Sequence, residues 1–499
     1  MGIRSILAKP FAAYVAKETI AWSSAPAESQ KKIFENLIST GSQTLFGKQH
    51  NFDSIKNYND FKSQVPVRDY EDLKIYMEKI VKGERNVLWP GIPKYLSKTS
   101  GTTSGVKYIP LTKESIPNHI NGARNAILSY IHETGKSSFS DKKLIFLSGS
   151  PQLDFTGKIP TGRLSGIVNH HVPSWLRGNQ LPSIETNCIE DWEEKLERII
   201  DETLAQPMSL ISGIPPWVQM YFDRIHDRTQ KLIKDVFPDF SLFIYGGVSF
   251  EPYRKKLFES IGKEIDSIET YPASEGFIAY QDSQNKNGLL LLLNSGIFFE
   301  FIPADEFFNE KPSRLMIDQI ELNKNYAVVL SNNAGLWSYS LGDTVKFISD
   351  SPFRLVVTGR IKHFISAFGE HVIGEEVEKA MEHACSSQPG TEIIEFTVAP
   401  NVSPESGLPH HEWYIEFRSP PVDLSKFIYE LNLRLQELNP YYDDLISGKI
   451  LSNLKIISLR RDSFREYMKQ IGKLGGQNKV PRLSNDRKIA DELIKYAII

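Results

Sequence analysis

The sequence predicts an α/β protein with a large, multi-layer N-terminal domain, built from mixed sheets and a β-barrel-like part, and a small α+β C-terminal domain. Three observations predict this fold. Helices alternate with apolar strands from Leu144 to Tyr271, the pattern becomes strand-rich after Gly288, and a new helix–strand unit follows residues 359–362. Because 499 residues exceed what one core usually serves, we expect domains over 1–359 and 360–499.

The first 90 residues have the pattern of helices. Apolar residues from Ile3 to Val15 recur with helical spacing, and Lys9 and Lys17 interrupt what would otherwise resemble the apolar core of a signal sequence. The stretch Asp69-Tyr70-Glu71-Asp72 can cap a helix over 73–81. No run approaches the ~18 apolar residues of a membrane span. This region is therefore expected to serve packing.

The segment from Lys98 to Lys107 is the most unusual stretch of the chain. It holds five hydroxyl side chains, two glycines and two lysines between apolar runs at 94–96 and 108–111. Glycines let backbone N–H groups approach an anion, while hydroxyls and lysines add hydrogen bonds and positive charge, so the segment suits phosphate. The same composition is also typical of ordinary turns. It lacks the Walker spacing, so the common P-loop fold is not implied.

Alternation of helix and strand follows this segment and predicts a largely parallel sheet. The expected helices are 115–133, 190–204, 217–236 and 253–261, and the expected strands are 144–148, 208–212, 242–245 and 266–271. Ligands in such sheets bind beyond the carboxyl ends of the strands. That rule selects the loops Tyr245–Ser249 and Thr270–Gly276.

Strands dominate from Gly288 onward, which predicts an antiparallel sheet or distorted barrel closing the large domain. They are expected at 289–293, 297–302, 326–331, 338–347 and 354–357. The C-terminal unit then has helices at 375–384, 424–438 and 486–496, and strands at 393–399, 412–417 and 455–459. Between them, residues 472–482 are basic and glycine-rich, too polar for a core.

Bulk composition narrows the classes of partner. A formal charge of −3 gives no overall attraction to nucleic acid. Cys188 and Cys385 lack the spacing of a zinc site or a disulfide framework, which fits a reducing, cytoplasmic location. We expect small-molecule partners, with no nucleic acid, membrane or obligate protein partner.

The loops together can satisfy each part of a bound ATP. Glu275 can hold Mg²⁺ between phosphate oxygens, because hard cations take carboxylate ligands. Asp343 can accept both ribose hydroxyls, Tyr271 can lie along adenine, and the hydroxyls of 99–103 can hold phosphates. Each residue alone also has an ordinary structural interpretation in a turn, core or surface. Only their combination and order point to nucleotide chemistry.

Four motifs carry a resemblance over nearly the whole chain. They are Thr99-Ser100-Gly101-Thr102-Thr103, Tyr271-Pro272-Ala273-Ser274-Glu275-Gly276, Tyr339-Ser340-Leu341-Gly342-Asp343 and Gln477-Asn478-Lys479-Val480-Pro481-Arg482. In this order they resemble those of the auxin-responsive acyl acid amido synthetases, the Gretchen Hagen family, within the adenylate-forming, firefly-luciferase-like superfamily.

The resemblance implies a ligase that works in two half-reactions. A carboxylic acid first attacks the α-phosphate of MgATP to give acyl-AMP, and the amine of an amino acid or another amine then takes the acyl group. ATP and Mg²⁺ are the implied cofactors, and a small mobile C-terminal domain closes as a lid about a hinge near Lys362. Glu275 is the implied metal ligand and, with Lys479, a catalytic residue. The implied nucleotide-binding residues are Thr99, Ser100, Thr102, Thr103, Gly247, Val248, Tyr271, Ser274, Asp343 and Arg360.

Several alternatives stay open at this stage. Thr99 and Pro272 replace the family's usual serine and alanine, and His363 stands where many relatives have aspartate after the hinge. Lys473, in a Gly-Lys pair, is the rival catalytic lysine. The acyl pocket candidates are Arg124, Ile127, Ile214 and Trp217. Coenzyme A as acceptor would make the protein an acyl-CoA ligase, and ATP binding without pyrophosphate release would indicate a non-catalytic scaffold.

Overall fold

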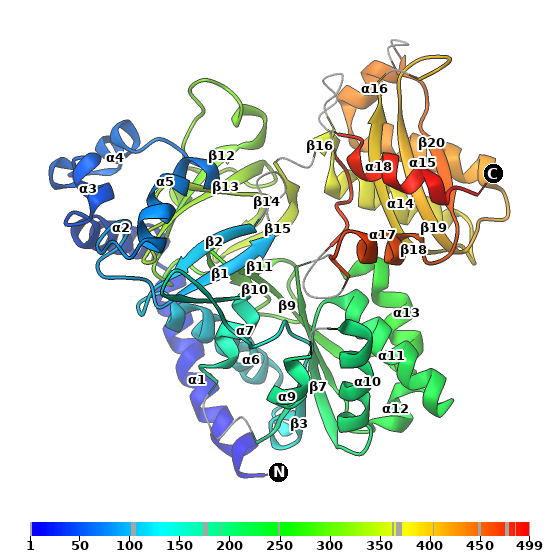
Figure 1. Cartoon of the computed structure of the whole chain (residues 1–499), viewed down its shortest axis with the longest axis horizontal. Helices are drawn as coiled ribbons and strands as arrows, with labels where there is room; N and C mark the ends of the chain where they lie inside the picture. The colour runs from blue at the N-terminus through cyan, green and yellow to red at the C-terminus, as the bar shows by residue number, and fades with distance from the viewer. Residues whose placement is uncertain are drawn as a thin grey trace. The chain divides into compact units, whose positions relative to one another are not determined.

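The computed structural model describes most of the chain. It covers residues 2–498 except 101–105, 173–177, 190, 248–249, 362–363, 366–371, 403, 448–450, 475–478 and 485. The chain divides into two compact units (Figure 1). The first contains 1–341 and 346–356, and the second contains 342–345 and 357–499.

Helices open the first unit. Their bounds are α1 (Ile3–Ser23), α2 (Pro26–Gly41), α3 (Leu45–Gln49), α4 (Tyr58–Gln64) and α5 (Tyr70–Val81). The predicted cap of α5 is confirmed: the Asp69 side chain accepts from the Glu71 N–H, and Asp72 completes a capping box. No helix within the described ranges is both long and apolar enough to cross a membrane.

The hydroxyl-rich segment joins the two strands of a hairpin, β1 (Tyr95–Ser100) and β2 (Val106–Leu111). β1 runs farther than the predicted strand 94–96, so Thr99 lies on the strand, opposite Lys107. The cross-strand ladder outlasts the apolar run because backbone hydrogen bonds do not require apolar side chains. In a second sheet, β1 also pairs with β5 (Ile159–Gly162), and β5 pairs with β4 (Asp154–Thr156).

Eleven strands within the described residues form one mixed sheet. Its parallel part runs through β6, β3, β7, β8 and β9. The sheet continues with β10 and then with the strands from Leu289 onward, in the order β11, β15, β14, β13 and β12. The bounds are β3 (Lys143–Phe146), β6 (Gln180–Leu181), β7 (Met208–Ser212), β8 (Leu242–Gly246), β9 (Asp266–Ala273), β10 (Gly276–Tyr280), β11 (Leu289–Leu291), β12 (Ile297–Pro303), β13 (Asn325–Asn332), β14 (Tyr339–Asp350) and β15 (Phe353–Arg360).

Both faces of the parallel part are covered by helices (Figure 1). Neighbouring residues of one strand point to opposite faces. Leu210 accordingly packs in the core with α1 and α6 (Ile116–Thr134), whereas Ile211 packs in the core with α10 (Trp192–Thr203) and α11 (Pro215–Thr229). The unbroken apolar runs read from the sequence are the pattern of such doubly covered strands.

The remaining helices differ from expectation at one point. The helix predicted over 217–236 is two helices, because Gln230 adopts a left-handed conformation with φ 56° and ends α11 before α12 (Ile233–Val236). Among the described residues, this unit also contains the helices α7 (Leu164–Asn169), α9 (Ile184–Asn187) and α13 (Glu251–Ile261).

The second unit is a three-layer α+β structure. Strands β18 (Glu392–Asn401), β19 (His410–Ser419) and β20 (Lys455–Leu459) form its sheet. One core joins the sheet to α14 (Gly374–Ser387) and α15 (Leu424–Leu438), and another joins it to α17 (Ser463–Gln470) and α18 (Lys488–Leu493). The shorter elements are β16 (Phe364–Ile365), β17 (Val372–Ile373) and α16 (Pro440–Ser447).

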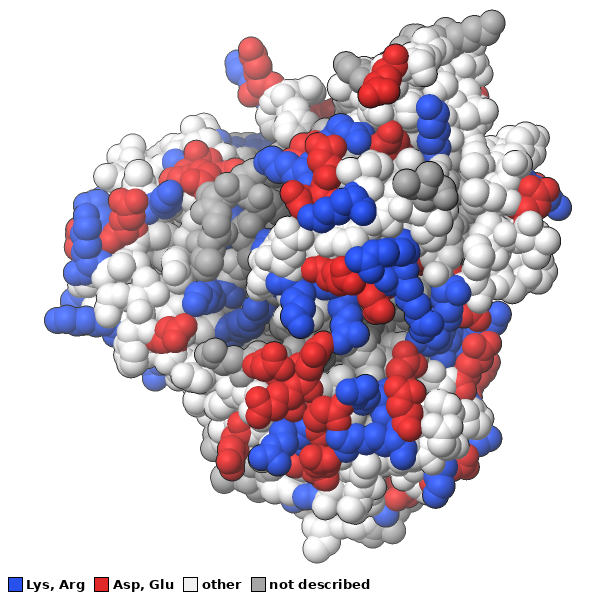
Figure 2. Space-filling view, turned by 45° about the vertical axis from the view of Figure 1, so that its right-hand side comes forward, with Lys and Arg blue, Asp and Glu red and all other residues white. Residues whose placement is uncertain are grey.

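The surface charges are mixed in sign (Figure 2), and the two cysteines are not bonded to each other. Figure 2 shows Lys and Arg side chains intermingled with Asp and Glu over the face it presents. Cys188 and Cys385 are both free thiols.

Candidate active site

Strand β1 places Thr99 beside the loop that carries Glu275. The Ser97 hydroxyl donates to the Ser274 hydroxyl at 3.0 Å, so one face of β1 meets this loop. Because side chains alternate along a strand, Thr99 lies on the same face as Ser97, whereas Lys98 lies on the other face and pairs with Asp154 at 3.2 Å. The structure therefore places the predicted phosphate-binding Thr99 on the strand face that contacts the loop carrying Glu275.

Glu275 is held at the turn between β9 and β10 by two neighbours. The Asn332 amide donates to the Glu275 backbone carbonyl at 2.6 Å. The Tyr339 hydroxyl hydrogen-bonds the Glu275 carboxylate, and burial, followed by the Glu275 charge, raises the pKa of Tyr339 well above its ordinary range. Tyr339 thus remains a neutral donor that orients the Glu275 carboxylate.

The ends of β8 and β9 lie side by side, and their backbones approach closely at Gly246 and Thr270. A Cβ added at Gly246 would stand 2.4 Å from the Thr270 carbonyl oxygen, so only glycine fits there. The Thr270 hydroxyl donates to the Tyr245 carbonyl at 2.9 Å, and Gly247 has φ 81°. Tyr271, the predicted adenine platform, follows on β9 and is buried.

Asp343 and Arg360 meet in the second unit. The Arg360 Nε donates to the Asp343 Oδ1 at 2.8 Å. Gly342, with φ 81°, precedes Asp343, and its carbonyl accepts from the Ile361 N–H at 2.8 Å. These backbone contacts fix the two strand segments that carry the pair. A carboxylate is an acceptor only, which is the property that the predicted contact with ribose hydroxyls requires.

Lys479 belongs to the same group. Desolvation lowers the pKa of Lys479 to about 8, the Asp343 carboxylate opposes that change, and the Arg360 cation adds to it. The residue keeps solvent-exposed surface, although protein atoms desolvate its ammonium. A lysine with this pKa is charged at neutral pH and holds its proton less tightly than an ordinary lysine.

Arg482 anchors the segment that carries Lys479. Its guanidinium pairs with Glu378 at 3.2 Å and with Glu395, and it stacks on the Phe396 ring at 4.6 Å. The Val398 N–H donates to the Arg482 carbonyl at 2.9 Å. The end of the fourth motif is thus an edge of the small sheet, and it fixes the chain three residues after Lys479.

The other predicted residues lie in varied places. Arg124 is exposed, with its guanidinium 5.2 Å from the Phe11 ring centre of α1. Ile127 packs beside the core of α1 and α6, and Ile214 and Trp217 belong to the core of α10 and α11. The side chains of Ser100, Thr102, Thr103 and Val248, and the hinge residue Lys362, lie outside the described residues.

Sequence reasoning missed two residues that organise the site. The sequence analysis assigns Tyr339 no role beyond its place in a motif. A tyrosine inside an apolar strand, however, needs a hydrogen-bond partner for its hydroxyl. Asn332 gave no local signal, because its partner Glu275 is 57 residues away. No group of three acidic, histidine or cysteine ligands occurs among the described residues. A magnesium ion at Glu275 would therefore take its other ligands from phosphate and water, which fits the preference of Mg²⁺ for oxygen and its retention of water.

Three family models match the chain. They are the GH3 family N-terminal domain over residues 16–183, the GH3 family central domain over 290–360, and the GH3 family C-terminal domain over 375–488. These ranges include the β1–β2 hairpin, Tyr339, Asp343, Arg360 and Lys479.

Curated relatives match at low identity over most of the chain. The jasmonoyl–L-amino acid synthetase JAR4 of Nicotiana attenuata is 24% identical over 451 residues, covering 76% of this chain and 77% of that protein. The indole-3-acetic acid-amido synthetase GH3.4 of Arabidopsis thaliana is 22% identical over 539 residues, covering 92% of this chain and 89% of that protein.

Solved structures share the fold. AtGH3.15 acyl acid amido synthetase in complex with 2,4-DB superposes with TM-score 0.80 and 16% identity, covering 98% of this chain and 96% of that one. A 2-hydroxyisobutyryl-CoA ligase with a bound acyl-AMP has TM-score 0.63 and 13% identity, covering 94% of this chain and 92% of that one.

Proposed function

We propose, because the chain belongs to the GH3 family, that it is an ATP-dependent acyl acid amido synthetase. It activates a carboxylic acid as acyl-AMP and transfers the acyl group to the amine of an amino acid or another amine. An acid oxygen attacks the α-phosphorus and pyrophosphate leaves; the amine nitrogen then attacks the acyl carbon, AMP leaves, and the nitrogen loses a proton.

The observation that carries this proposal is the grouping of Asp343, Arg360 and Lys479 within one unit. Charge builds on the oxygens around the α-phosphorus during transfer, and a positioned ammonium stabilises it. Lys479 supplies that ammonium, while the Asp343 carboxylate accepts from the ribose hydroxyls. Arg360 holds Asp343 in place.

Glu275 would hold the magnesium ion that accompanies ATP, and that ion would neutralise phosphate charge. Tyr339 orients its carboxylate, and Thr99 on the adjacent face of β1 donates to phosphate. A magnesium ion there supplies charge neutralisation and orientation of the leaving pyrophosphate. We place adenine along Tyr271.

The test is pyrophosphate release from MgATP across aromatic, indole and fatty acids. Each acid is assayed alone, with mixed amino acids, or with coenzyme A. Acid-dependent release that rises with amino acids, with the amide identified by mass spectrometry, is the expected result. A rise with coenzyme A alone would replace the proposal with an acyl-CoA ligase, and ATP binding without release would leave only a scaffold.

Variants test the residue roles. Lys479→Ala is expected to lose adenylation while retaining ATP binding, and Lys473→Ala, a matched lysine six residues earlier, is expected to keep adenylation. Glu275→Ala should raise the Mg²⁺ concentration needed for half-maximal rate. Full activity in Lys479→Ala with loss in Lys473→Ala would reverse the assignment of the catalytic lysine.

A further inference from the structure

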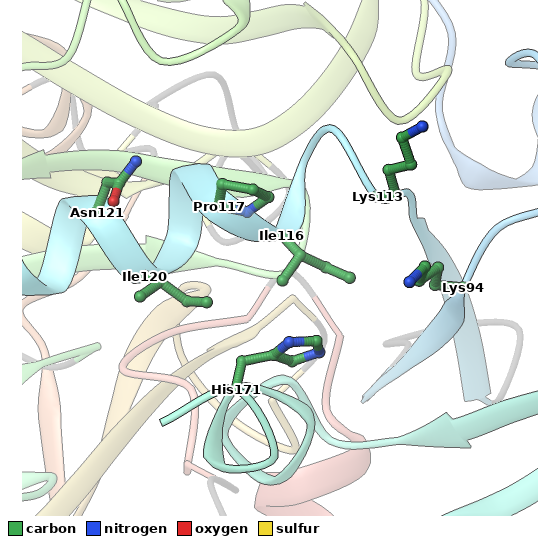
Figure 3. Close-up of a pocket in the computed structure, with 7 residues that line it drawn as sticks. All are labelled: Lys94, Lys113, Ile116, Pro117, Ile120, Asn121 and His171. Carbon is green, nitrogen blue, oxygen red and sulfur yellow. The ribbon is translucent and has the colours of Figure 1, made fainter. Parts of the chain in front are cut away.

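The first unit contains a pocket whose lining residues are not part of the candidate active site. Its volume is about 310 Å³, at the lower end of the ~300–1,000 Å³ typical of small-molecule sites. Figure 3 shows Ile116, Pro117 and Ile120 of α6 along one side and His171, just after α7, across from them. The described residues that complete the lining are Lys94, Lys113 and Asn121.

The two ends of the pocket differ in chemistry. The α6 side chains give it an apolar wall, and Ile116 and Ile120 continue into a small core with Tyr95 and Ile167. None of the described lining residues is acidic. Lys94 and His171 are basic residues of the same lining. The lining thus suits a ligand with an apolar body and a negative group.

Lys94 and His171 together form the polar end. The Lys94 N–H donates to the Leu111 carbonyl at 2.8 Å, which fixes the lysine at the start of β1, and its ammonium points toward Ile116 and His171 (Figure 3). The Tyr95 ring packs edge-on against His171 at 5.6 Å. The buried Nε2 of His171 has no hydrogen-bond partner among the described residues. Burial of this kind is costly unless a ligand or water supplies the partner.

The pocket lies apart from the phosphate-binding end of β1. Lys94 precedes the strand and Thr99 stands five residues later, so their backbones are about 17 Å apart at the ~3.4 Å rise of each strand residue. A carboxylate held by Lys94 is therefore too far from Thr99 to be the group that attacks ATP.

We propose that this pocket is a second binding site, which takes a small amphipathic carboxylate. Lys94 and the His171 N–H bind the carboxylate oxygens, and Ile116, Pro117 and Ile120 pack on the apolar body. Two sources share this chemistry, namely a free acid and an N-acyl amino acid, which keeps the carboxylate of its amino acid. The proposal stands on the pocket's own residues and does not require the proposed function.

Isothermal titration of the full chain without ATP tests it. Benzoate is the probe for a free acid, N-benzoylglycine is the probe for a conjugate, and benzamide is the neutral comparison. We expect at least one carboxylate to bind at least about tenfold more tightly than benzamide, because hydrogen bonds to a charged group contribute ~1.5–3 kcal/mol. Whichever carboxylate binds more tightly identifies the source. Equal binding of all three compounds would overturn the proposal.

Matched variants locate the binding. Lys94→Met keeps the apolar stem of the side chain and should weaken carboxylate binding at least about tenfold. His171→Phe should also weaken carboxylate binding, by a smaller factor. Lys113→Met is the control, because Lys113 points away from the pocket and lies 3.9 Å from Glu114 (Figure 3). An unchanged affinity in Lys94→Met, or an equal loss in Lys113→Met, would refute the site. Circular dichroism confirms that each variant is folded before titration.

Discussion

Replacing Lys479 with arginine tests whether its lowered pKa governs adenylation. The ammonium must be charged to stabilise the α-phosphate oxygens, so activity should fall as pH rises through the pKa. Desolvation sets that pKa at about 8. An ordinary lysine, with a pKa near ~10.4, would stay charged throughout this range. Arginine stays protonated at every pH of the assay.

The magnitude follows from the fraction of charged lysine. With a pKa of about 8, roughly 90% of Lys479 is protonated at pH 7 and roughly 10% at pH 9. The kcat/KM for adenylation should therefore fall about tenfold between these two pH values. Because kcat/KM reports the free enzyme and kcat the substrate complex, bound ATP should move the fall in kcat to higher pH.

The assay is pyrophosphate exchange into ATP without an acceptor amine, which isolates the first half-reaction. Lys479→Arg should lose the alkaline fall while keeping any change caused by ionisation of the substrates, so the ratio of the two profiles isolates the lysine. Lys473→Arg is the matched control and should keep the fall. A wild-type profile that stays flat to pH 10, or a fall that persists in Lys479→Arg, would refute the reasoning.

Three further outcomes follow from the packing. Arg482→Leu should leave ATP binding intact, slow adenylation about tenfold or more through misplacement of the lysine segment, and move the alkaline fall in kcat/KM. Glu300→Gln leaves the buried Arg314, 2.6 Å away, without its counter-charge and should cost ~3–5 kcal/mol in urea unfolding. Gly246→Ala should cost ~1–3 kcal/mol in the same assay, because its Cβ would clash with the Thr270 carbonyl. Unchanged unfolding in either variant would contradict the contact concerned.

Much of the fold was predictable because its signals are local. Unbroken apolar runs marked the parallel strands, and the capping residues at Asp69 marked the start of α5. Strand–helix alternation also placed Tyr245 and Thr270 at neighbouring strand ends, which the ladder between β8 and β9 confirms. These inferences need only the spacing of residue types along one segment.

Long-range contacts limited the rest. The extension of the parallel sheet by β11 to β15 depends on pairings such as Leu289 with Leu355, which no local pattern reveals. The hydrogen bond from Asn332 to Glu275 is equally distant in sequence. The acyl pocket candidates stay predictions. The contact of Arg124 with Phe11 arises from the packing of α6 on α1, which the residue spacing within α6 does not reveal.

In the β1–β2 hairpin, the side chains of residues 95–99 alternate between the two faces of the sheet. Deleting Ser97 would move Lys98 and Thr99 each to the opposite face, since successive side chains alternate. A cation would then stand where a hydroxyl now lies beside the Glu275 loop. Deleting two residues would restore the alternation. Deletions of two residues from this strand should therefore be tolerated better than deletions of one. Substitutions that exchange the polar residue types of the two strand faces should do more harm than substitutions that keep each type on its own face.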